Sequence, residues 1–158
     1  MEIVECINSV KVGSQIIFRK GELIDMDNLS RIPLDCGVFN INFNNPEYFR
    51  KYNQKYNIGA FVLYANKKGT YFCRIKEFIP SSKKYRIKQV NGGFSEIVCE
   101  RDIVLVNAYY FINTEGCVCI TYIGKNKNRD KWLFLTGNQF KTEEEAKNKY
   151  NEITNGKY

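Results

Sequence analysis

Short apolar runs separated by turn-forming residues dominate the middle of the chain. Between residues 58 and 106 there are five such runs: FVLYA, TYFCRIKEFI, YRIKQV, FSEIVC and IVLV. Consecutive runs are separated by segments typical of tight turns or corners, which read KKG, PSSKK, NGG and ERD. This pattern predicts five short antiparallel strands that form a small barrel or a strongly bent sheet.

The first 44 residues contain two further candidate strands. One covers Gln15 to Arg19 and is followed by a turn at Lys20-Gly21. In GVFNINF, at positions 37–43, apolar and polar side chains alternate, which indicates a half-buried strand. We therefore expect this segment to be rich in strands as well.

The segment NNPEYFRKYNQKYN, residues 44–57, has the features of a short helix. Asn45 is a suitable N-cap, and Pro46 suits the first helical position. The rings of Phe49, Tyr52 and Tyr56 recur at helical spacing. We expect these rings to pack into the core rather than to bind a ligand.

The last third of the chain predicts a three-stranded meander closed by a helix. Thr142 and Glu145 have the spacing of a capping box, which marks the start of that helix. Acidic residues in its first turn suit the helix dipole, and apolar residues recur along one face. These residues are Glu143 and Glu144 in the turn, and Ala146, Tyr150 and Ile153 on the face.

The predicted elements define an α+β protein made mostly of antiparallel sheet. We expect N-terminal strands with a short helix at residues 1–57, a small barrel at 58–106, and a meander with a C-terminal helix at 107–158. The linker-like stretch GKNKNRD, at 124–130, is too short to separate domains. The three parts are therefore expected to pack into one compact assembly.

Two parts of the sequence resemble known groups of proteins. The motif YRIKQVNGGFSEIV followed by DIVLV resembles a Tudor-like small β-barrel, which implies that fold for residues 58–106. The ending, an IN..G turn and then GNQF.TEEEA, is similar to that of many small uncharacterised proteins of bacteriophages and low-GC bacteria. This second resemblance implies a phage or mobile-element origin and no particular chemistry.

The composition is that of a folded globular protein, with 44% hydrophobic and 26% charged residues. The N-terminal MEIVECINSV lacks the basic start of a secretion signal, and no apolar run is long enough to span a membrane. We expect a protein of the bacterial host's cytoplasm that does not bind membranes. Its six cysteines should then be reduced thiols.

The net charge of +7 is unevenly distributed. Residues 1–44 carry four basic and six acidic side chains, whereas residues 58–106 carry nine basic and four acidic ones. The middle of the chain is therefore the part that attracts anions, with nucleic acid as the first candidate.

The sequence gives little support for catalysis. Histidine is absent, which removes the commonest general base and metal ligand, and there is no phosphate-binding GxxxxGK[ST] loop. We therefore expect no enzymatic activity and no cofactor.

Two metal sites are conceivable from residue types, but we favour neither. Cys117 and Cys119 lie two apart and could bind zinc with another thiolate, but paired knuckles are missing, so buried small side chains are the preferred interpretation. An acidic group could hold a divalent cation, but a solvated loop is the preferred interpretation there. The other residues concerned are Cys6, Cys36, Cys73 and Cys99 for zinc, and Glu22, Asp25, Asp27 and Asp35 for the cation.

The candidate binding residues for an anionic partner are four cations on two of the predicted strands: Arg74, Lys76, Arg86 and Lys88. A turn at residues 80–84 would place Ile79 opposite Tyr85, Phe78 opposite Arg86, and Lys76 opposite Lys88. Like charges directly opposite each other destabilise a sheet, so they are tolerated either for solubility or for an anion. A three-residue turn at 91–93 would also bring Glu96 opposite Lys88 and neutralise part of this charge.

Aromatic residues near these cations leave three interpretations open. The candidate contact residues are Phe72, Phe78, Tyr85 and Phe94. Cations interleaved with rings suit nucleic acid, because cations contact phosphates while rings stack on bases. An ordinary solvated face with Phe72 and Phe78 buried is the second interpretation. A methyl-lysine or arginine cage of the Tudor kind, built from Tyr71, Tyr85 and Phe94, is the third.

These observations predict a non-catalytic binding protein that acts by contact with a host macromolecule. The partner is expected to be a host protein or ribonucleoprotein, and inhibition of a nucleic-acid-guided or nucleotide-signalling defence is one specific form of this hypothesis. The alternative is a small nucleic-acid-binding protein that uses the basic strands. The oligomeric state is left open.

Overall fold

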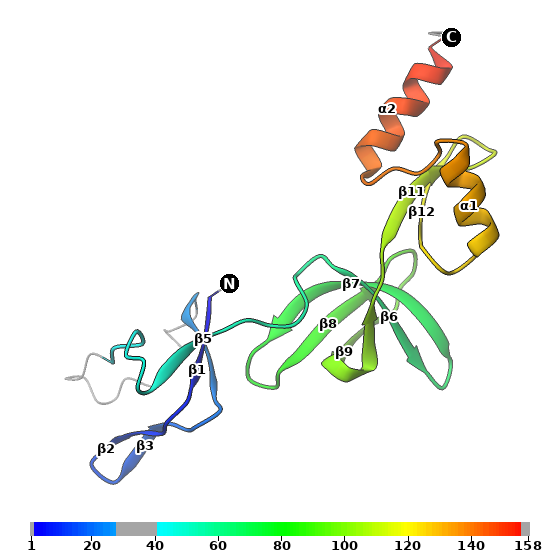
Figure 1. Ribbon diagram of the computed structural model, residues 1–158. Helices are drawn as coiled ribbons and strands as arrows, with labels where there is room; N and C mark the ends of the chain where they lie inside the picture. The colour runs from blue at the N-terminus through cyan, green and yellow to red at the C-terminus, as the bar shows by residue number, and fades with distance from the viewer. Residues whose placement is uncertain (1, 28–40, 156–158) are drawn as a thin grey trace. The chain divides into compact units, whose positions relative to one another are not determined.

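The computed structural model describes residues 2–27 and 41–155 (Figure 1). The chain forms two compact units: unit 1 comprises residues 1–60 and 64–103, and unit 2 comprises residues 61–63 and 104–158. Antiparallel sheets dominate the structure and are accompanied by two α-helices, so the expected α+β class is confirmed. The division at residues 57 and 106 stays a prediction.

The N-terminal part of unit 1 is a three-stranded sheet with a small hairpin. β1 pairs with β4 on one side and β5 on the other, and β2 pairs with β3. The strand and turn expected at residues 15–21 are confirmed. The strand bounds are β1 (Ile3–Cys6), β2 (Val10–Val12), β3 (Gln15–Phe18), β4 (Leu23–Asp25) and β5 (Phe49–Tyr52).

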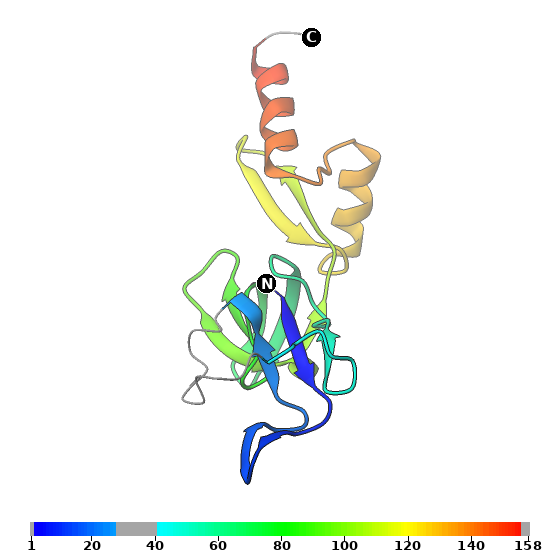
Figure 2. The same ribbon diagram turned by 90° about the vertical axis from the view of Figure 1, so that its left-hand side faces the viewer.

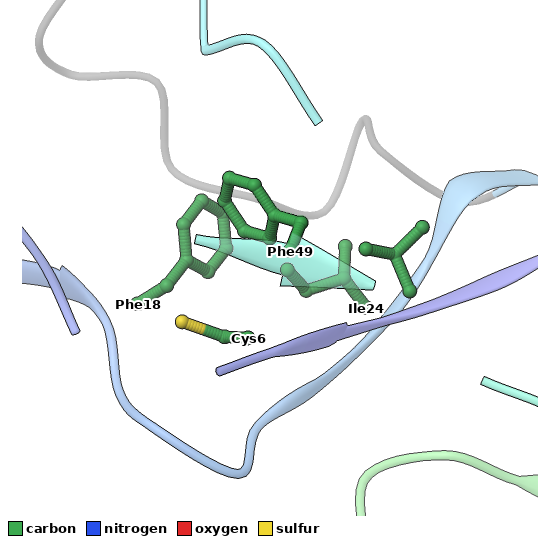
Figure 3. Close-up of a cluster of buried hydrophobic side chains, with 5 residues drawn as sticks. Cys6, Phe18, Ile24 and Phe49 are labelled. Carbon is green, nitrogen blue, oxygen red and sulfur yellow. The ribbon is translucent and has the colours of Figure 1, made fainter. Parts of the chain in front are cut away.

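Buried side chains from four of these strands form a small core. Figure 3 shows the rings of Phe18 and Phe49 next to Ile24 and Cys6, and Val4 completes the cluster. The two rings meet edge to face, with centroids 6.0 Å apart. Cys6 is fully buried, and burial raises the pKa of its thiol, so it serves as a small apolar side chain.

The helix predicted at residues 44–57 is wrong. The side-chain oxygen of Asn45 accepts a hydrogen bond from the Glu47 amide at 3.1 Å, which makes a turn, and Phe49–Tyr52 then pairs with β1. This pairing buries Phe49 against β1 and β3, and a partner so distant in sequence overrides the local helical spacing. Of the strand predicted at 37–43, residues 37–40 lie outside the described residues, and 41–43 are not in a strand.

The five strands predicted between residues 58 and 106 are confirmed. They form one antiparallel sheet in the order β10-β6-β7-β8-β9, and a short 3-10 turn at Glu100–Asp102 makes the expected corner. β9 and β10 are edge strands, and none of the sheets within the described ranges closes into a barrel. The bounds are β6 (Phe61–Asn66), β7 (Gly69–Ile79), β8 (Lys84–Gln89), β9 (Ser95–Cys99) and β10 (Ile103–Leu105).

One face of this sheet carries its core. Tyr56 packs there edge to face against Tyr85, and the backbone amide of Tyr56 donates a hydrogen bond to the Tyr85 hydroxyl at 3.2 Å. The hydroxyl of Tyr56 donates to the carbonyl of Ile103 at 3.3 Å, so both buried phenol groups have partners. The buried residues of β7, β8 and β9 are Cys73, Ile75, Phe78, Tyr85, Ile87 and Val98.

Unit 2 contains the hairpin of β11 (Ala108–Ile112) and β12 (Val118–Tyr122), followed by α1 (Lys127–Leu135) and α2 (Glu143–Thr154). Figure 2 shows α1 alongside the hairpin. The predicted three-stranded meander is wrong, because the sheet of unit 2 has two strands within the described residues, to which Phe140 adds an isolated bridge at Tyr110.

Helix caps explain both helices of unit 2. The side chain of Asn126 accepts a hydrogen bond from the Arg129 amide at 3.0 Å, so α1 begins inside the segment that reads as a linker. The predicted C-terminal helix is confirmed, because Thr142 accepts from the Glu145 amide at 3.2 Å. The Glu145 carboxylate accepts in turn from the Lys141 amide, one residue before the usual capping-box position.

Candidate anion-binding face of the central sheet

The pairing of β7 with β8 differs from the predicted register. Arg74, not Lys76, lies opposite Lys88, and Glu77 lies opposite Arg86. The register shifts between Ile75 and Glu77, which identifies a β-bulge at Lys76. The extra residue changes how the cations of the two strands are paired. No pattern in the sequence predicted this bulge.

The bulge decides which side chains reach solvent. Lys76 and Glu77 are consecutive in sequence, yet both are exposed, because the extra residue interrupts the alternation of the strand. The next residue, Phe78, is only 2% exposed and belongs to the core. Without the bulge, Phe78 and Arg86 would share a face, as the sequence predicted.

We call the four exposed cations Arg74, Lys76, Arg86 and Lys88 the cationic face. The predicted site residues are therefore brought together on one surface of β7 and β8. Arg74 and Lys88 form a like-charge cross-strand pair, which costs stability on the order of a few tenths of a kcal/mol.

Two members of the cationic face have contacts within the chain. The Arg86 side chain donates to the Glu77 carboxylate at 3.0 Å, and the Arg74 side chain donates to the carbonyl of Gly59 at 3.0 Å. On its other side, Lys88 lies opposite Ser95 and not opposite Glu96 as predicted. The formal charges of the four cations and of Glu77 add up to +3.

Two of the predicted aromatic contacts, Phe78 and Tyr85, lie in the core and not beside these cations. Tyr85 is fully buried, and its ring packs against Phe78 at a centroid distance of 5.0 Å. Phe72 is half-buried, two positions before Arg74 on β7. The core rings therefore cannot stack on a ligand held at the cationic face.

Tyr64, Tyr71 and Phe94 form one aromatic cluster, of which sequence reasoning missed Tyr64. Phe94 stacks on Tyr71 at 4.1 Å with an interplanar angle of 8°, and it also stacks on Tyr64 at 5.9 Å. Of the three cage candidates, Tyr71 and Phe94 are thus brought together while Tyr85 lies in the core. Because Tyr71 and Phe94 are in face-to-face contact, no cation fits between them.

The surroundings of this cluster are acidic. Desolvation, followed by the nearby carboxylates of Glu96 and Asp102, raises the pKa of Tyr64. A sequence signal was available, because Tyr64 and Tyr71 stand at equal distances from the turn at Lys67-Lys68, where a hairpin pairs them.

The residues considered for metal binding are not assembled into a site. Within residues 2–27 and 41–155, no three His, Cys, Asp or Glu side chains are grouped as ligands. The burial expected for this pair of cysteines is wrong for Cys117, which is exposed, whereas Cys119 is half-buried and its sulfur lies 3.5 Å from the Asn113 side-chain amide. Asp35 and Cys36 lie outside the described residues.

Comparison of the chain with protein-family models, curated proteins and solved structures found no match. No described helix has the length and apolar character needed to cross a bilayer. The proposals below therefore rest on the geometry and charge of the chain, together with the resemblances of its sequence.

Proposed function

We propose that this is a non-catalytic binding protein that holds an anionic macromolecule of the host against the cationic face. The observation that carries this proposal is the bulge at Lys76, which adds an exposed cation next to the like-charge pair of Arg74 and Lys88. If this pair had no function, an acidic residue opposite Arg74 or Lys88 would make the sheet more stable.

A protein or ribonucleoprotein is the partner that this geometry favours. Single-stranded nucleic acid is usually held by cations and stacked rings together, whereas Phe78 and Tyr85 are in the core. An acidic protein surface needs only charge complementarity. Inhibition of a nucleic-acid-guided nuclease or of nucleotide signalling, by a phage or mobile-element protein, is the specific form of this proposal, and it is supported by the resemblance of the C-terminal segment.

A Tudor-like arrangement of residues 58–106 is part of the same proposal. The sheet order places the fifth strand of the segment, β10, beside its first, β6, and a 3-10 turn precedes β10. This order supports the resemblance, although the sheet is open between β9 and β10.

Nucleic acid is the second candidate, and the formal charge of +3 on the cationic face and Glu77 favours it. Contacts to phosphates need no rings, and they release counterions, so binding of this kind weakens steeply with salt.

Affinity capture from a lysate of a low-GC bacterium, with and without nuclease, tests the proposal. We expect a nuclease-resistant partner that is captured by the native chain and lost in the double variant Lys76→Glu/Lys88→Glu. The control is Lys67→Glu/Lys68→Glu, which makes the same charge change in an exposed turn. Loss of every partner on nuclease treatment supports the nucleic-acid candidate, and equal capture by both variants refutes a role for the cationic face.

A further inference from the structure

Helix α1 exposes three large apolar side chains. Trp132, Phe134 and Leu135 are 66%, 72% and 68% exposed, which are the highest values for large hydrophobic residues in the described part of the chain. Leu133 is the buried residue of this helix, at 8% exposed. Neighbouring apolar side chains in water are unfavourable, and such patches usually mark an interaction site.

The same face of α1 is positively charged. Residues 127, 131, 134 and 135 are spaced i, i+4, i+7 and i+8 and therefore lie along one side of the helix. Lys127 and Lys131 are both exposed and precede Phe134 and Leu135 on this side. Trp132 lies beyond Leu135 on the adjoining side of the helix, because residues two apart, such as Trp132 and Phe134, do not share a side. We call these five residues the outer face of α1.

Two residues of α1, Arg129 and Asp130, tie the helix to its own unit. The Asp130 carboxylate accepts hydrogen bonds from the Tyr109 hydroxyl and from the Gly124 amide. The guanidinium of Arg129 donates to the Thr121 hydroxyl at 2.9 Å. These contacts turn the acid of the helix inward and hold the helix in place, so the outer face presents cations and apolar groups from a pre-organised element.

We infer that the outer face of α1 docks into an apolar groove of a partner protein whose rim is acidic. We expect the rim to be acidic because Lys127 and Lys131 lie beside the apolar residues, whereas the carboxylate of Asp130 is bound to the Tyr109 hydroxyl. The apolar part selects a groove, because tryptophan is a frequent anchor of protein interfaces and a helix typically inserts side chains three and four residues apart.

Other occupants fit this face less well. A second copy would bring two sets of lysines together on a chain whose net charge is already +7. Interfacial membrane helices carry their lysines on the side opposite the apolar residues, whereas Lys127 and Lys131 share a side of α1 with Phe134 and Leu135. Nucleic acid would leave Leu135 without a stacking role.

The inference is independent of the cationic face, because it uses none of the same residues. A variant of one surface therefore leaves the other intact, and failure of either proposal is recognised separately.

Trp132 is the single tryptophan of the chain, so its fluorescence reports on α1 directly. In the intact protein we expect emission typical of an exposed indole, with stronger quenching by iodide than by caesium because of the neighbouring lysines. Protection of Trp132 from both quenchers would mean that the chain covers this face itself, and it would overturn the inference.

The binding probe is a synthetic peptide of two antiparallel helices, whose leucine faces form a groove bordered by glutamates, and a peptide of the same composition in scrambled order is its control. We expect the first peptide to shift Trp132 emission to shorter wavelength and to protect it from quenching. Phe134→Ser/Leu135→Ser should weaken binding by about tenfold or more, whereas the control Ile153→Ser, an exposed apolar residue on α2, should leave it unchanged.

Charge reversal and competing ligands complete the test. Lys127→Glu/Lys131→Glu should weaken peptide binding, and Lys76→Glu/Lys88→Glu should not. A response to phosphatidylglycerol vesicles, to a single-stranded oligonucleotide or to protein concentration, in place of the peptide, would overturn the inference in favour of that occupant. Equal responses to the ordered and scrambled peptides, or none to either, would also overturn it.

Discussion

Tyr150 of α2 packs on the β11–β12 hairpin at Gly116, where a methyl group on the glycine would clash with the tyrosine ring. Gly116 has φ = +80°, and a Cβ placed on it would lie 2.9 Å from the Cε2 atom of Tyr150 and 3.0 Å from its hydroxyl oxygen. Real Cβ atoms essentially never approach another atom as closely as 2.9 Å, so Gly116→Ala must displace the ring of Tyr150. We therefore predict that this substitution destabilises unit 2.

The magnitude has two parts. A left-handed backbone costs a residue other than glycine about 1–2 kcal/mol, and the reduced entropy of the unfolded chain offsets about 0.4–1 kcal/mol of this. Overpacking against Tyr150 adds about 1–3 kcal/mol. The free energy of unfolding should therefore fall by about 1–4 kcal/mol in Gly116→Ala.

Gly137→Ala is the matched control, because Gly137 has φ = +74° and a Cβ placed on it would meet nothing within 4 Å. It should lose no more than about 1.5 kcal/mol, since only the backbone term applies. Urea unfolding followed by circular dichroism measures both variants. Tyr150→Leu should recover part of the loss when combined with Gly116→Ala, because the smaller side chain makes room. Equal losses in Gly116→Ala and Gly137→Ala would refute the reasoning, because the contact with Tyr150 would then contribute nothing.

Three further predictions concern the central sheet. Glu77→Gln should change the free energy of unfolding by less than about 1 kcal/mol, because the side chains of the Arg86–Glu77 pair are 46% and 50% exposed. The same substitution should tighten heparin binding in a low-salt titration, and weaker binding would contradict the role of the cationic face. Burial raises the pKa of Cys73 from 9.0 to about 11, so the stability that depends on its neutral thiol is present below pH 9 and is lost as the pH rises from 9 toward 11. In Cys73→Ala, the free energy of unfolding should fall less steeply with pH over this range than in the native chain. At pH 8, iodoacetamide should modify exposed Cys117 before Cys73, as judged by mass spectrometry. An unchanged pH dependence or the reverse order of modification would rule this out. Lys83→Gly should raise the free energy of unfolding by up to about 1 kcal/mol in urea titrations. Lys83 has φ = +56°, and glycine relieves about 1–2 kcal/mol of this backbone strain while losing about 0.5–1 kcal/mol in entropy on folding. A clear loss of stability would show that the turn needs the lysine side chain.

The strands between residues 58 and 106 were predictable because each is short and each is bounded by its own turn signal. The same holds for α2, whose start depends on the side chain of Thr142 and the amide of Glu145, three residues apart. Local hydrogen bonds of this kind need no distant partner, so the sequence pattern contains the whole cause.

The wrong predictions concern segments whose conformation depends on residues distant in sequence. Phe49 and Tyr52 fit a helix or a strand equally well, and pairing with β1 selected the strand. The last third of the chain was expected to contain three strands and one helix, but a second helix, α1, forms there with an Asn126 cap and a contact between Asp130 and the hairpin. In both cases, contacts with residues outside the segment selected between two locally acceptable conformations.

The candidate site divides in the same way. The sequence alone identified Arg74, Lys76, Arg86 and Lys88 as cations on two adjacent strands, because charge and strand alternation are local properties. Which of them face each other, and which rings accompany them, depended on one bulge at Lys76 that moved Phe78 into the core. A bulge forms where packing of the whole sheet is improved by an extra residue, so only the tertiary structure could place it.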